Sequence, residues 1–273
     1  MSFRPPAGGR NSGAYYSMKI IQLNIWGGRY LKEAVAFFKQ ENADIICLQE
    51  VTSGIFTKAE SSDVQGIDVY EYIKKELGYD GVFEKCFSAE VDGDISHRGN
   101  AILSRYPLTD MYTEFYDYPF TRFDMNMEGR EYAHTQPQNF IVAHVETPQG
   151  KMRVMCTHMA WSRVCEDTER RIGQIKKIIT YLESVPDEQT LLCGDFNIHP
   201  QSESLNIFKS YFVNSGEGSI QNTLNPAVHP VFFNGDHPQG LAVDYILTHG
   251  LDATFVHSPE ITISDHLPVI AEM

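Results

Sequence analysis

Acidic and amide side chains stand beside apolar runs at two distant places in this chain. Asp195 and Asn197 follow the run 190–193, and Asp265 and His266 come just before the run 269–271 near the C-terminus. A carboxylate next to an apolar core is costly unless it binds a cation or a polar partner. The pattern therefore predicts that these residues belong to a binding or catalytic site.

Two further apolar runs finish in the same way. Asn24 ends the run 18–23, and Glu50 ends the run 45–49. Carboxylate and amide oxygens suit hard divalent cations such as Mg²⁺, which proteins hold through one or two carboxylates plus substrate phosphate. Four strand-like segments that end on such residues predict one converging metal site. An Asn in a turn before Gly27 and a solvated Glu at a strand end stay open as alternatives.

The pair Asp195 and Asn197 has the spacing of a water-activating unit. If the strand continues through Gly194, the two side chains point to the same face. The carboxylate can then accept a proton from a water molecule that the amide orients. A Gly-Asp-x-Asn surface turn is the alternative reading of the same residues.

Histidines supply the remaining chemistry. His266 follows Asp265 and can act as a base or stabilise negative charge, with Asp244 as a candidate partner because it interrupts an apolar strand. His158 closes the run 154–157 and can donate to a phosphate oxygen, or it can be structural. A Ser264 nucleophile is a weaker rival because it lacks a G-x-S-x-G context. The remaining His residues that lie near Pro, Gly or Ser are expected at the surface: His229, His237, His249 and His257.

The elements that must position these residues alternate between strands and helices. The apolar spacing predicts helices over 31–40, 67–77, 167–183 and 201–209. Strands are expected over 18–25, 44–48, 79–87, 100–104, 140–146, 152–157, 190–193, 243–247, 254–256 and 268–272. The segment 110–135 reads as a long loop with one short strand, and 214–241 as loop. This order predicts an α/β fold with two packed sheets flanked by helices.

The chain divides into a short leader and one domain. Residues 1–17 are rich in Gly, Pro, Ser and Arg, which predicts a disordered leader or a cloning remnant, followed by a single domain over 18–273. Residues 1–17 lack the apolar stretch of a secretory signal. No apolar run approaches the roughly 20 residues that span a membrane. We therefore expect a cytoplasmic protein, and we expect it to be a monomer.

The net charge and the cysteine pattern disfavour several classes of partner and metal site. The formal net charge of −14 argues against a general nucleic-acid binder, although bound divalent cations leave room for a nuclease. The five cysteines are odd in number and show no C-x-x-C spacing, so buried reduced thiols are expected. The sequence contains no H-E-x-x-H or Cys/His set typical of zinc.

Taken in order, these segments resemble the endonuclease/exonuclease/phosphatase superfamily. Each motif alone is weak, but the ordered set spans 18–273 and is specific. The matching strings are Leu23-Asn24-Ile25-Trp26-Gly27, Leu48-Gln49-Glu50-Val51, Gly99-Asn100-Ala101-Ile102-Leu103-Ser104-Arg105, Cys156-Thr157-His158, Cys193-Gly194-Asp195-Phe196-Asn197, Val243-Asp244-Tyr245-Ile246-Leu247 and Ser264-Asp265-His266-Leu267-Pro268.

The resemblance implies a four-layer α/β sandwich with two central mixed, mainly antiparallel sheets. It also implies Mg²⁺- or Mn²⁺-dependent cleavage of a phosphoester by in-line attack of water. The implied roles are metal binding for Glu50, Asn24 and Asp265; water activation and orientation for Asp195 and Asn197; phosphate contact for His266, oriented by Asp244, and for His158; and substrate contact for Arg98, Arg130 and Asn100.

Substrate class is the open question. A nuclease is the first expectation. A phosphatase or phosphodiesterase acting on a small phosphate ester or lipid head group, such as an inositol phosphate or sphingomyelin, is the alternative. Trp26 stands where abasic-site nucleases usually carry Asp, which weakens the DNA-repair reading. A second departure is Ala242, which stands where the family often has Arg. A catalytically silent binding protein of the same fold is disfavoured by the intact set of site residues.

Overall fold

A computed structural model describes residues 17–54, 64–91, 94–124, 135–162, 165, 167–230 and 241–273 of the 273-residue chain. The predicted leader, apart from Ser17, lies outside these residues, and so does Arg130.

The first of two sheets has seven strands in the order β12-β13-β1-β2-β4-β3-β6. Two of its neighbouring pairs, β1 with β2 and β3 with β6, are parallel, and the others are antiparallel. The strands are β1 (Lys19–Asn24), β2 (Ile45–Ser53), β3 (Asp80–Val91), β4 (Asp94–Ser104), β6 (Thr121–Asp124), β12 (Phe255–His257) and β13 (Val269–Glu272).

The second sheet has six strands in the order β10-β11-β9-β8-β7-β5. Only β8 and β9 run parallel to each other among its described pairs. The strands are β5 (Leu108–Phe115), β7 (Asn139–Thr147), β8 (Gly150–His158), β9 (Thr190–Asp195), β10 (Val213–Asn214) and β11 (Asp244–His249).

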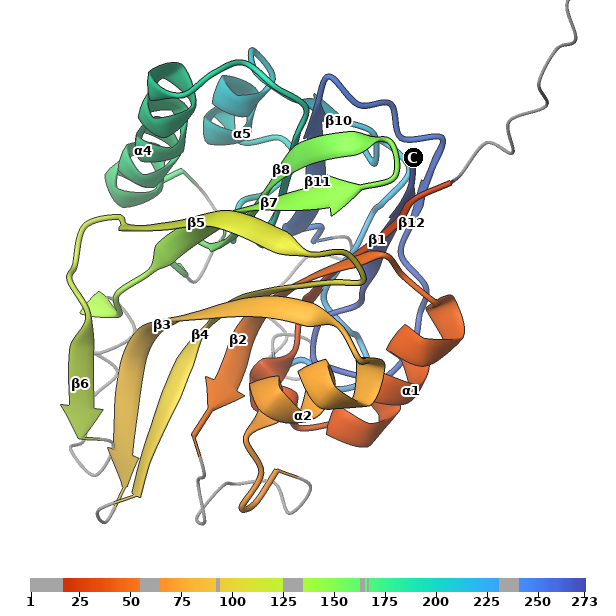
Figure 1. Ribbon diagram of the computed structural model, residues 1–273. Coiled ribbons are helices and arrows are strands. Elements are labelled where there is room, and N and C mark those ends of the chain that lie inside the picture. The colour runs from red at the N-terminus through yellow and green to blue at the C-terminus, as the bar shows by residue number, and fades with distance from the viewer. Residues whose placement is uncertain are drawn as a thin grey trace, which may run out of the picture.

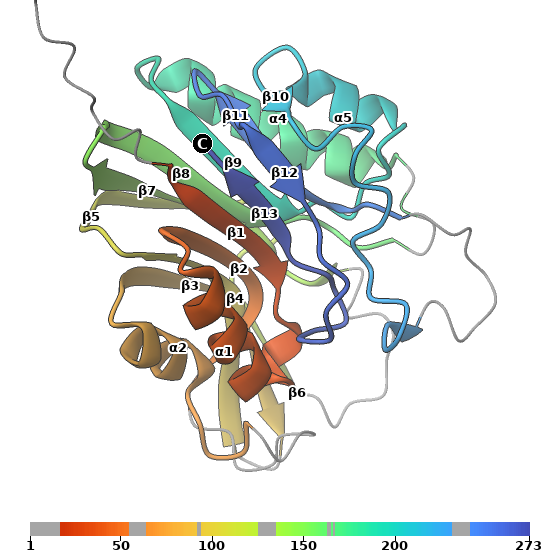
Figure 2. The same cartoon turned by 90° about the vertical axis from the view of Figure 1, so that its right-hand side faces the viewer.

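Helices cover the outer faces of the two stacked sheets, as Figures 1 and 2 show. One apolar cluster joins α1 and α2 to the first sheet, a second fills the space between the sheets, and a third joins α4 and α5 to the second sheet. The predicted four-layer α/β sandwich with mixed, mainly antiparallel sheets is therefore confirmed. The helices are η1 (Trp26–Gly28), α1 (Leu31–Glu41), α2 (Val69–Leu77), α4 (Glu169–Ser184) and α5 (Glu203–Phe208).

Local signals explain where two of these helices begin. The Asp68 side chain accepts a hydrogen bond from the backbone N–H of Glu71 and caps α2, and Thr168 does the same for Arg171 in α4. The α2 helix ends at Gly78, whose left-handed φ of 67° suits glycine.

The expectation of one short strand within residues 110–135 is wrong, and residues 125–134 of that segment lie outside the described residues. The structure has an eight-residue strand, β5, over Leu108–Phe115 and a second strand, β6, over Thr121–Asp124. Each is an edge strand of its sheet. An edge strand with one partner does not need the buried alternation that makes a central strand visible in sequence, and β5 is only partly buried along its length.

Parallel pairing brings the predicted site residues to one rim. The carboxyl ends of β1 and β2 meet in the first sheet, and those of β8 and β9 meet in the second. Strand alternation directs Ile20 and Cys47 of the first sheet, with Cys156 and Cys193 of the second, into the cluster between the sheets. All five cysteines are free and buried, as expected.

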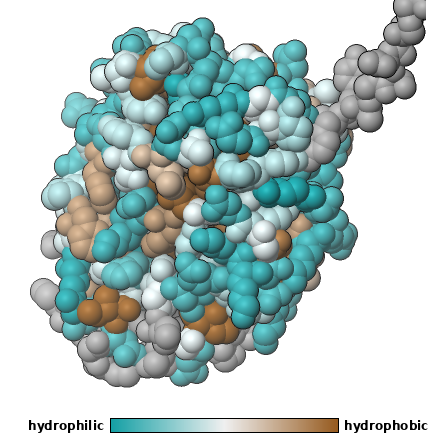
Figure 3. All heavy atoms as spheres, viewed as in Figure 1, coloured by the Kyte–Doolittle hydropathy of each residue, from teal (hydrophilic) through white to brown (hydrophobic). Residues whose placement is uncertain are grey.

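No helix in the described part of the chain is long and apolar enough to cross a membrane. The face shown in Figure 3 is mainly hydrophilic, and its apolar side chains lie in small separate patches. This face therefore carries no large contiguous apolar surface of the kind that marks an extensive interface.

Candidate active site

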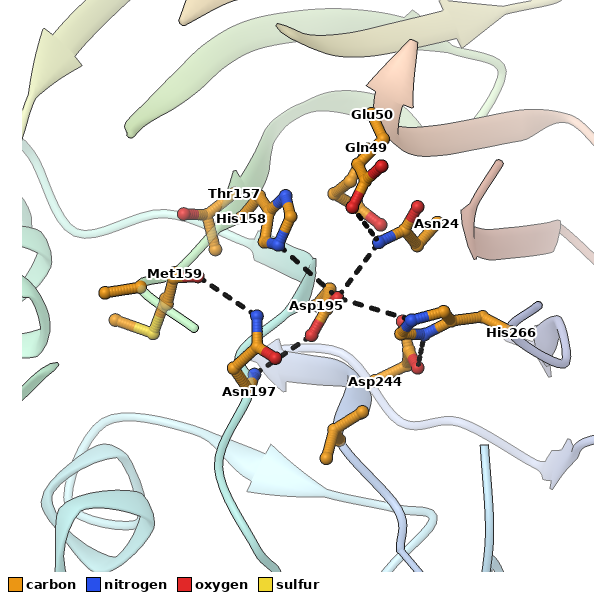
Figure 4. Close-up of polar contacts among 12 residues, drawn as sticks. Asn24, Gln49, Glu50, Thr157, His158, Met159, Asp195, Asn197, Asp244 and His266 are labelled. Carbon is orange, nitrogen blue, oxygen red and sulfur yellow. Dashed lines mark hydrogen bonds and ion pairs between the residues drawn. The ribbon is translucent and has the colours of Figure 1, made fainter. Parts of the chain in front are cut away.

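Asp195 lies at the centre of the candidate site (Figure 4). It is the last residue of β9 and is 1% exposed. Its Oδ2 atom accepts a hydrogen bond from Asn24 Nδ2 at 3.1 Å and lies 3.5 Å from His158 Nε2 and 3.8 Å from His266 Nε2. Residues from two other strand ends and one loop therefore converge on one carboxylate oxygen.

Asn197 meets Asp195 through a turn rather than through strand alternation. The strand ends at Asp195, and Asn197 has a left-handed φ of 52°. The backbone N–H of Asn197 donates to Asp195 Oδ1 at 3.0 Å, while Asn197 Nδ2 donates to the Met159 carbonyl at 3.1 Å. Gly194 is needed because a Cβ there would lie 2.5 Å from the Thr157 carbonyl oxygen on β8.

Glu50 is placed by a β-bulge rather than by the end of a strand. Leu48 pairs with Ala101 and Val51 pairs with Gly99, so β2 has one residue more than β4 between these pairs. The strand continues beyond Glu50 to Ser53, and Glu50 itself has a φ of 53°. Bulges re-aim side chains next to active sites, and strained backbone of this kind collects there.

The Glu50 carboxylate joins the centre of the site through Asn24. Asn24 Nδ2 donates to Glu50 Oε1 at 3.2 Å as well as to Asp195, and Arg98 Nη1 donates to Glu50 Oε2 at 3.1 Å. Burial opposes the charge of Glu50, but Arg98 and then His158 outweigh it and lower the pKa of the carboxyl below its usual range. The Glu50 carboxyl is therefore ionised at neutral pH, the state in which it could bind a cation.

Arg98 reaches Glu50 because Gly27 has no side chain. A Cβ on Gly27 would lie 2.9 Å from Arg98 Nη1 and 3.1 Å from its Cζ. Gly27 also has a φ of 68°, which other residues adopt at a cost of about 1–2 kcal/mol.

We expect Gly27→Ala to displace the Arg98 guanidinium and to raise KM for a phosphoester roughly tenfold, the size of one lost charge-assisted hydrogen bond. Steady-state kinetics with thermal denaturation measure both effects. Gly78→Ala is the matched control, because Gly78 has a φ of 67° and no atom within 4 Å of its added Cβ. Equal KM changes in the two variants would show that backbone strain alone is responsible.

His266 and Asp244 form a buried pair. His266 Nδ1 lies 2.8 Å from Asp244 Oδ2, and the two residues are 6% and 2% exposed. Burial lowers the pKa of the His266 imidazole, but Asp244 and Asp195 outweigh it and raise that pKa well above its usual value. Burial also raises the pKa of Asp244. His266 is therefore an imidazolium whose Nε2–H faces the centre of the site.

Asp265 and Ser264 lie beside Asn24 at the same rim. Burial, with Glu50 and Asp195 nearby, raises the pKa of Asp265 to about 6. The Ser264 hydroxyl contacts the Asn24 carbonyl at 2.6 Å and Asp265 Oδ1 at 3.2 Å, and it is 0% exposed. This hydroxyl holds two site segments together, so the geometry does not support the rival Ser264 nucleophile.

The three residues predicted to contact substrate have different outcomes in the structure. Arg98 lies beside Glu50, and Arg130 lies outside the described residues. Asn100 is 1% exposed and donates through Nδ2 to Asn139 Oδ1 at 2.8 Å. Asn100 nevertheless lines a shallow hollow together with Glu50, Arg98, His158 and Gln138.

Sequence reasoning missed His229. Its ring centroid lies 5.7 Å from that of His266, and one of its ring nitrogens lies within 4.8 Å of ligand atoms of Asp265 and His266. His229 is half-buried, and the expected surface position did not foresee its contact with His266. The loop around it is dense in Asn, Gly, Pro and His, and only the loop's return to the rim shows which His faces the site.

The donor chemistry fits a divalent cation. Glu50 and Asp265 offer carboxylate oxygens, while Asn24 turns Nδ2 toward Glu50 and Asp195 and its Oδ1 accepts from the Trp26 backbone N–H at 3.1 Å. Oxygen-rich, carboxylate-containing sites favour Mg²⁺ and Mn²⁺ over softer metals. Two groups of side chains also place their ligand atoms within 4.8 Å of one another, but both include His266, which as an imidazolium has no lone pair for a metal.

The family model described as "Endonuclease/Exonuclease/phosphatase family" matches residues 21–266. The chain belongs to this family. Proteins of this endonuclease/exonuclease/phosphatase family are generally divalent-metal-dependent hydrolases of phosphoester bonds, so the predicted superfamily and the coarse activity class are supported.

The chain is similar to a curated protein and to a solved structure of the same family. The Escherichia coli (strain K12) protein named "Uncharacterized protein YbhP" is 27% identical over 203 residues, covering 67% of each chain. A family protein from Leptotrichia buccalis has a TM-score of 0.67 at 15% identity, covering 93% of this chain and 98% of its own.

Two further solved structures carry more specific names. The mannosyl-6-phosphatase Bt3783 of Bacteroides thetaiotaomicron has a TM-score of 0.63 at 17% identity, covering 94% of this chain and 99% of its own. The human Nocturnin catalytic domain has a TM-score of 0.58 at 19% identity, covering 94% and 92%. At these identities the similarity shows the shared fold.

Proposed function

We propose that this protein is a divalent-metal-dependent phosphoesterase that hydrolyses a small phosphate ester by in-line attack of water. The observation that carries the proposal is the convergence of Asn24, His158 and His266 on Asp195 Oδ2. A buried carboxylate ringed by donors, beside an oxygen-donor metal set, has the parts that phosphoryl transfer needs.

Each residue has a defined task in this reaction. Asp195 accepts the proton of the attacking water, and the backbone N–H of Asn197 holds the carboxylate in place. The His266 imidazolium donates to a phosphate oxygen as negative charge develops there. Glu50 and Asp265, with Asn24 beside them, would hold Mg²⁺ or Mn²⁺, which when bound polarises the phosphoryl oxygen and stabilises the leaving oxygen.

Charge around the site favours a small substrate over a long polyanion. The net charge is −14, and several arginines of the described chain are already engaged with acids: Arg98 with Glu50, Arg122 with Glu90 and Arg170 with Asp117. A nucleic-acid groove needs several cations that replace condensed counterions along the backbone. These pairs leave less basic surface for such a groove.

A small hollow beside Glu50 and His158 has room for about one water molecule or one hydroxyl group of a substrate. Its lining includes Asn100, Gln136 and Gln138. Amides both donate and accept hydrogen bonds, so they suit a polar, hydroxyl-bearing group. The similarity to a mannosyl-6-phosphatase is consistent with this choice. Cleavage of nucleic acid stays a prediction, favoured by the name of the family.

A substrate panel tests the proposal. It includes p-nitrophenyl phosphate, bis-p-nitrophenyl phosphate, sugar and inositol phosphates, sphingomyelin, plasmid DNA, abasic duplex and single-stranded RNA, each with Mg²⁺, with Mn²⁺ and with EDTA. We expect EDTA to abolish turnover and kcat/KM to be highest for a small ester. We also expect only a shallow dependence on salt, since one phosphate releases few counterions.

The panel separates the candidate functions. Preference for DNA or RNA, with activity that falls steeply between about 50 and 200 mM salt, would establish the nuclease instead. Absence of metal-dependent turnover on every substrate would contradict the phosphoesterase proposal itself.

A further inference from the structure

Two fully buried glutamines lie between the sheets, directly beneath the active site. Gln22 on β1 and Gln49 on β2 are both 0% exposed. Strand alternation puts them in the inter-sheet row, one step beyond the apolar residues Ile20 and Cys47. An apolar pair would fill this position at lower cost, because a buried amide that loses a partner costs about 1–3 kcal/mol.

The two amides hydrogen-bond to each other reciprocally, each nitrogen donating to the other's oxygen. Gln22 Nε2 donates to Gln49 Oε1, and Gln49 Nε2 donates back to Gln22 Oε1 at 2.8 Å. Gln49 Nε2 also contacts Cys156 Sγ at 3.2 Å. The reciprocal pair fixes the orientation of both amides, because flipping either one would put two donors or two acceptors face to face.

The second N–H of Gln22 points across to the other sheet. Gln22 Nε2 donates to Asp244 Oδ1 at 3.3 Å, while Asp244 Oδ2 faces His266 Nδ1 at 2.8 Å. The backbone N–H of Asp244 contacts Thr223 Oγ1 at 3.1 Å. The two oxygens of Asp244 are therefore held from opposite sides, one by Gln22 and one by His266.

We propose that Gln22, held by Gln49, is a positioning residue of this active site: its amide fixes the rotation of the Asp244 carboxylate and thereby the ring of His266. This inference rests on the proposed phosphoesterase function. It gives the buried pair a task that neighbouring apolar positions do not need. Since Gln49 directly precedes Glu50, the same pair ties the metal side of the site to the phosphate side.

Gln22→Met tests the proposal, because methionine has a similar length and no donor. We expect kcat on bis-p-nitrophenyl phosphate with Mn²⁺ to fall about tenfold, the size of one hydrogen bond to a charged group, with KM within about twofold of its original value. In an Asp244→Asn background the same change is expected to have no further effect, because the carboxylate that Gln22 orients is gone.

Gln174→Met is the matched control. Gln174 is 1% exposed and accepts a hydrogen bond from the Ala160 backbone at 2.9 Å, and the structure records no contact between it and Asp244. Gln174→Met is expected to change kcat by the same factor with and without Asp244→Asn. A Gln22→Met effect that also multiplies equally in both backgrounds would reduce Gln22 to a packing role and overturn the proposal.

A second measurement applies even where Gln22→Met does not fold. The side-chain amide resonances of Gln22 in ¹⁵N-labelled, metal-free protein are expected to shift in Asp244→Asn and to stay unchanged in Asp187→Asn at the surface. Unchanged resonances in Asp244→Asn would overturn the contact. This arm does not depend on turnover, so its outcome is separate from that of the phosphoesterase proposal.

Discussion

Asp195→Asn is expected to lower kcat roughly 10³-fold, within the range of 10²–10⁴ that a positioned general base contributes. The amide keeps the size of the side chain but cannot accept the proton of the attacking water. It also places a donor against Asn24, His158 and His266, which all face Asp195 Oδ2. KM is expected to change little, because the lost interaction belongs to the transition state.

A surface pair provides the control for this change. Asp187 lies 2.7 Å from His249 Nε2 and its side chain is 90% exposed. Asp187→Asn removes an Asp–His contact away from the site, so its kcat should match that of the unchanged protein. Full activity of Asp195→Asn, measured under the same metal concentration, would show that Asp195 is not the base.

His266→Gln is expected to lower kcat about 10²–10³-fold, the usual loss for one donor aimed at developing negative charge. Glutamine can still donate a hydrogen bond, but it cannot carry the positive charge that Asp244 and Asp195 maintain on His266. The variant also leaves the Asp244 carboxylate buried beside an uncharged partner. Single-turnover kinetics separate this loss from changes in product release.

Asp244 and His266 are expected to act as one unit. Asp244→Asn should lower kcat by a similar factor, because each change removes the same charged donor. The kcat of the double variant should therefore equal that of the less active single variant. His249→Gln, which changes the exposed partner of Asp187, is the control. Additive losses would indicate that Asp244 and His266 work in separate steps.

Strand alternation and strand ends made most of the fold predictable. The core strands β1, β8 and β9 end at the predicted residues Asn24, His158 and Asp195. These strands are buried and apolar, so their limits show as changes in side-chain type. The edge strand β5 was missed because its one-sided pairing leaves much of its length partly exposed and polar.

The candidate site was predictable in its membership but not in its construction. Glu50 and Asn197 were expected from positions at strand ends, yet both depend on left-handed backbone, Glu50 at a bulge and Asn197 in a turn. A bulge depends on the pairing of two strands that are far apart in sequence, so no local pattern reveals it.

The sequence by itself determined the inventory: strand-end carboxylates, amides and histidines in the order of the endonuclease/exonuclease/phosphatase family. Residue type and spacing are local properties, and they limit which chemistry the chain can perform. Only the tertiary structure decided the partners. It brought Gln22 into hydrogen-bond contact with Asp244, His229 beside His266, and the Arg98 guanidinium against the backbone of Gly27. Each pair joins segments that are far apart in sequence, so their distance depends on how the strands and sheets pack.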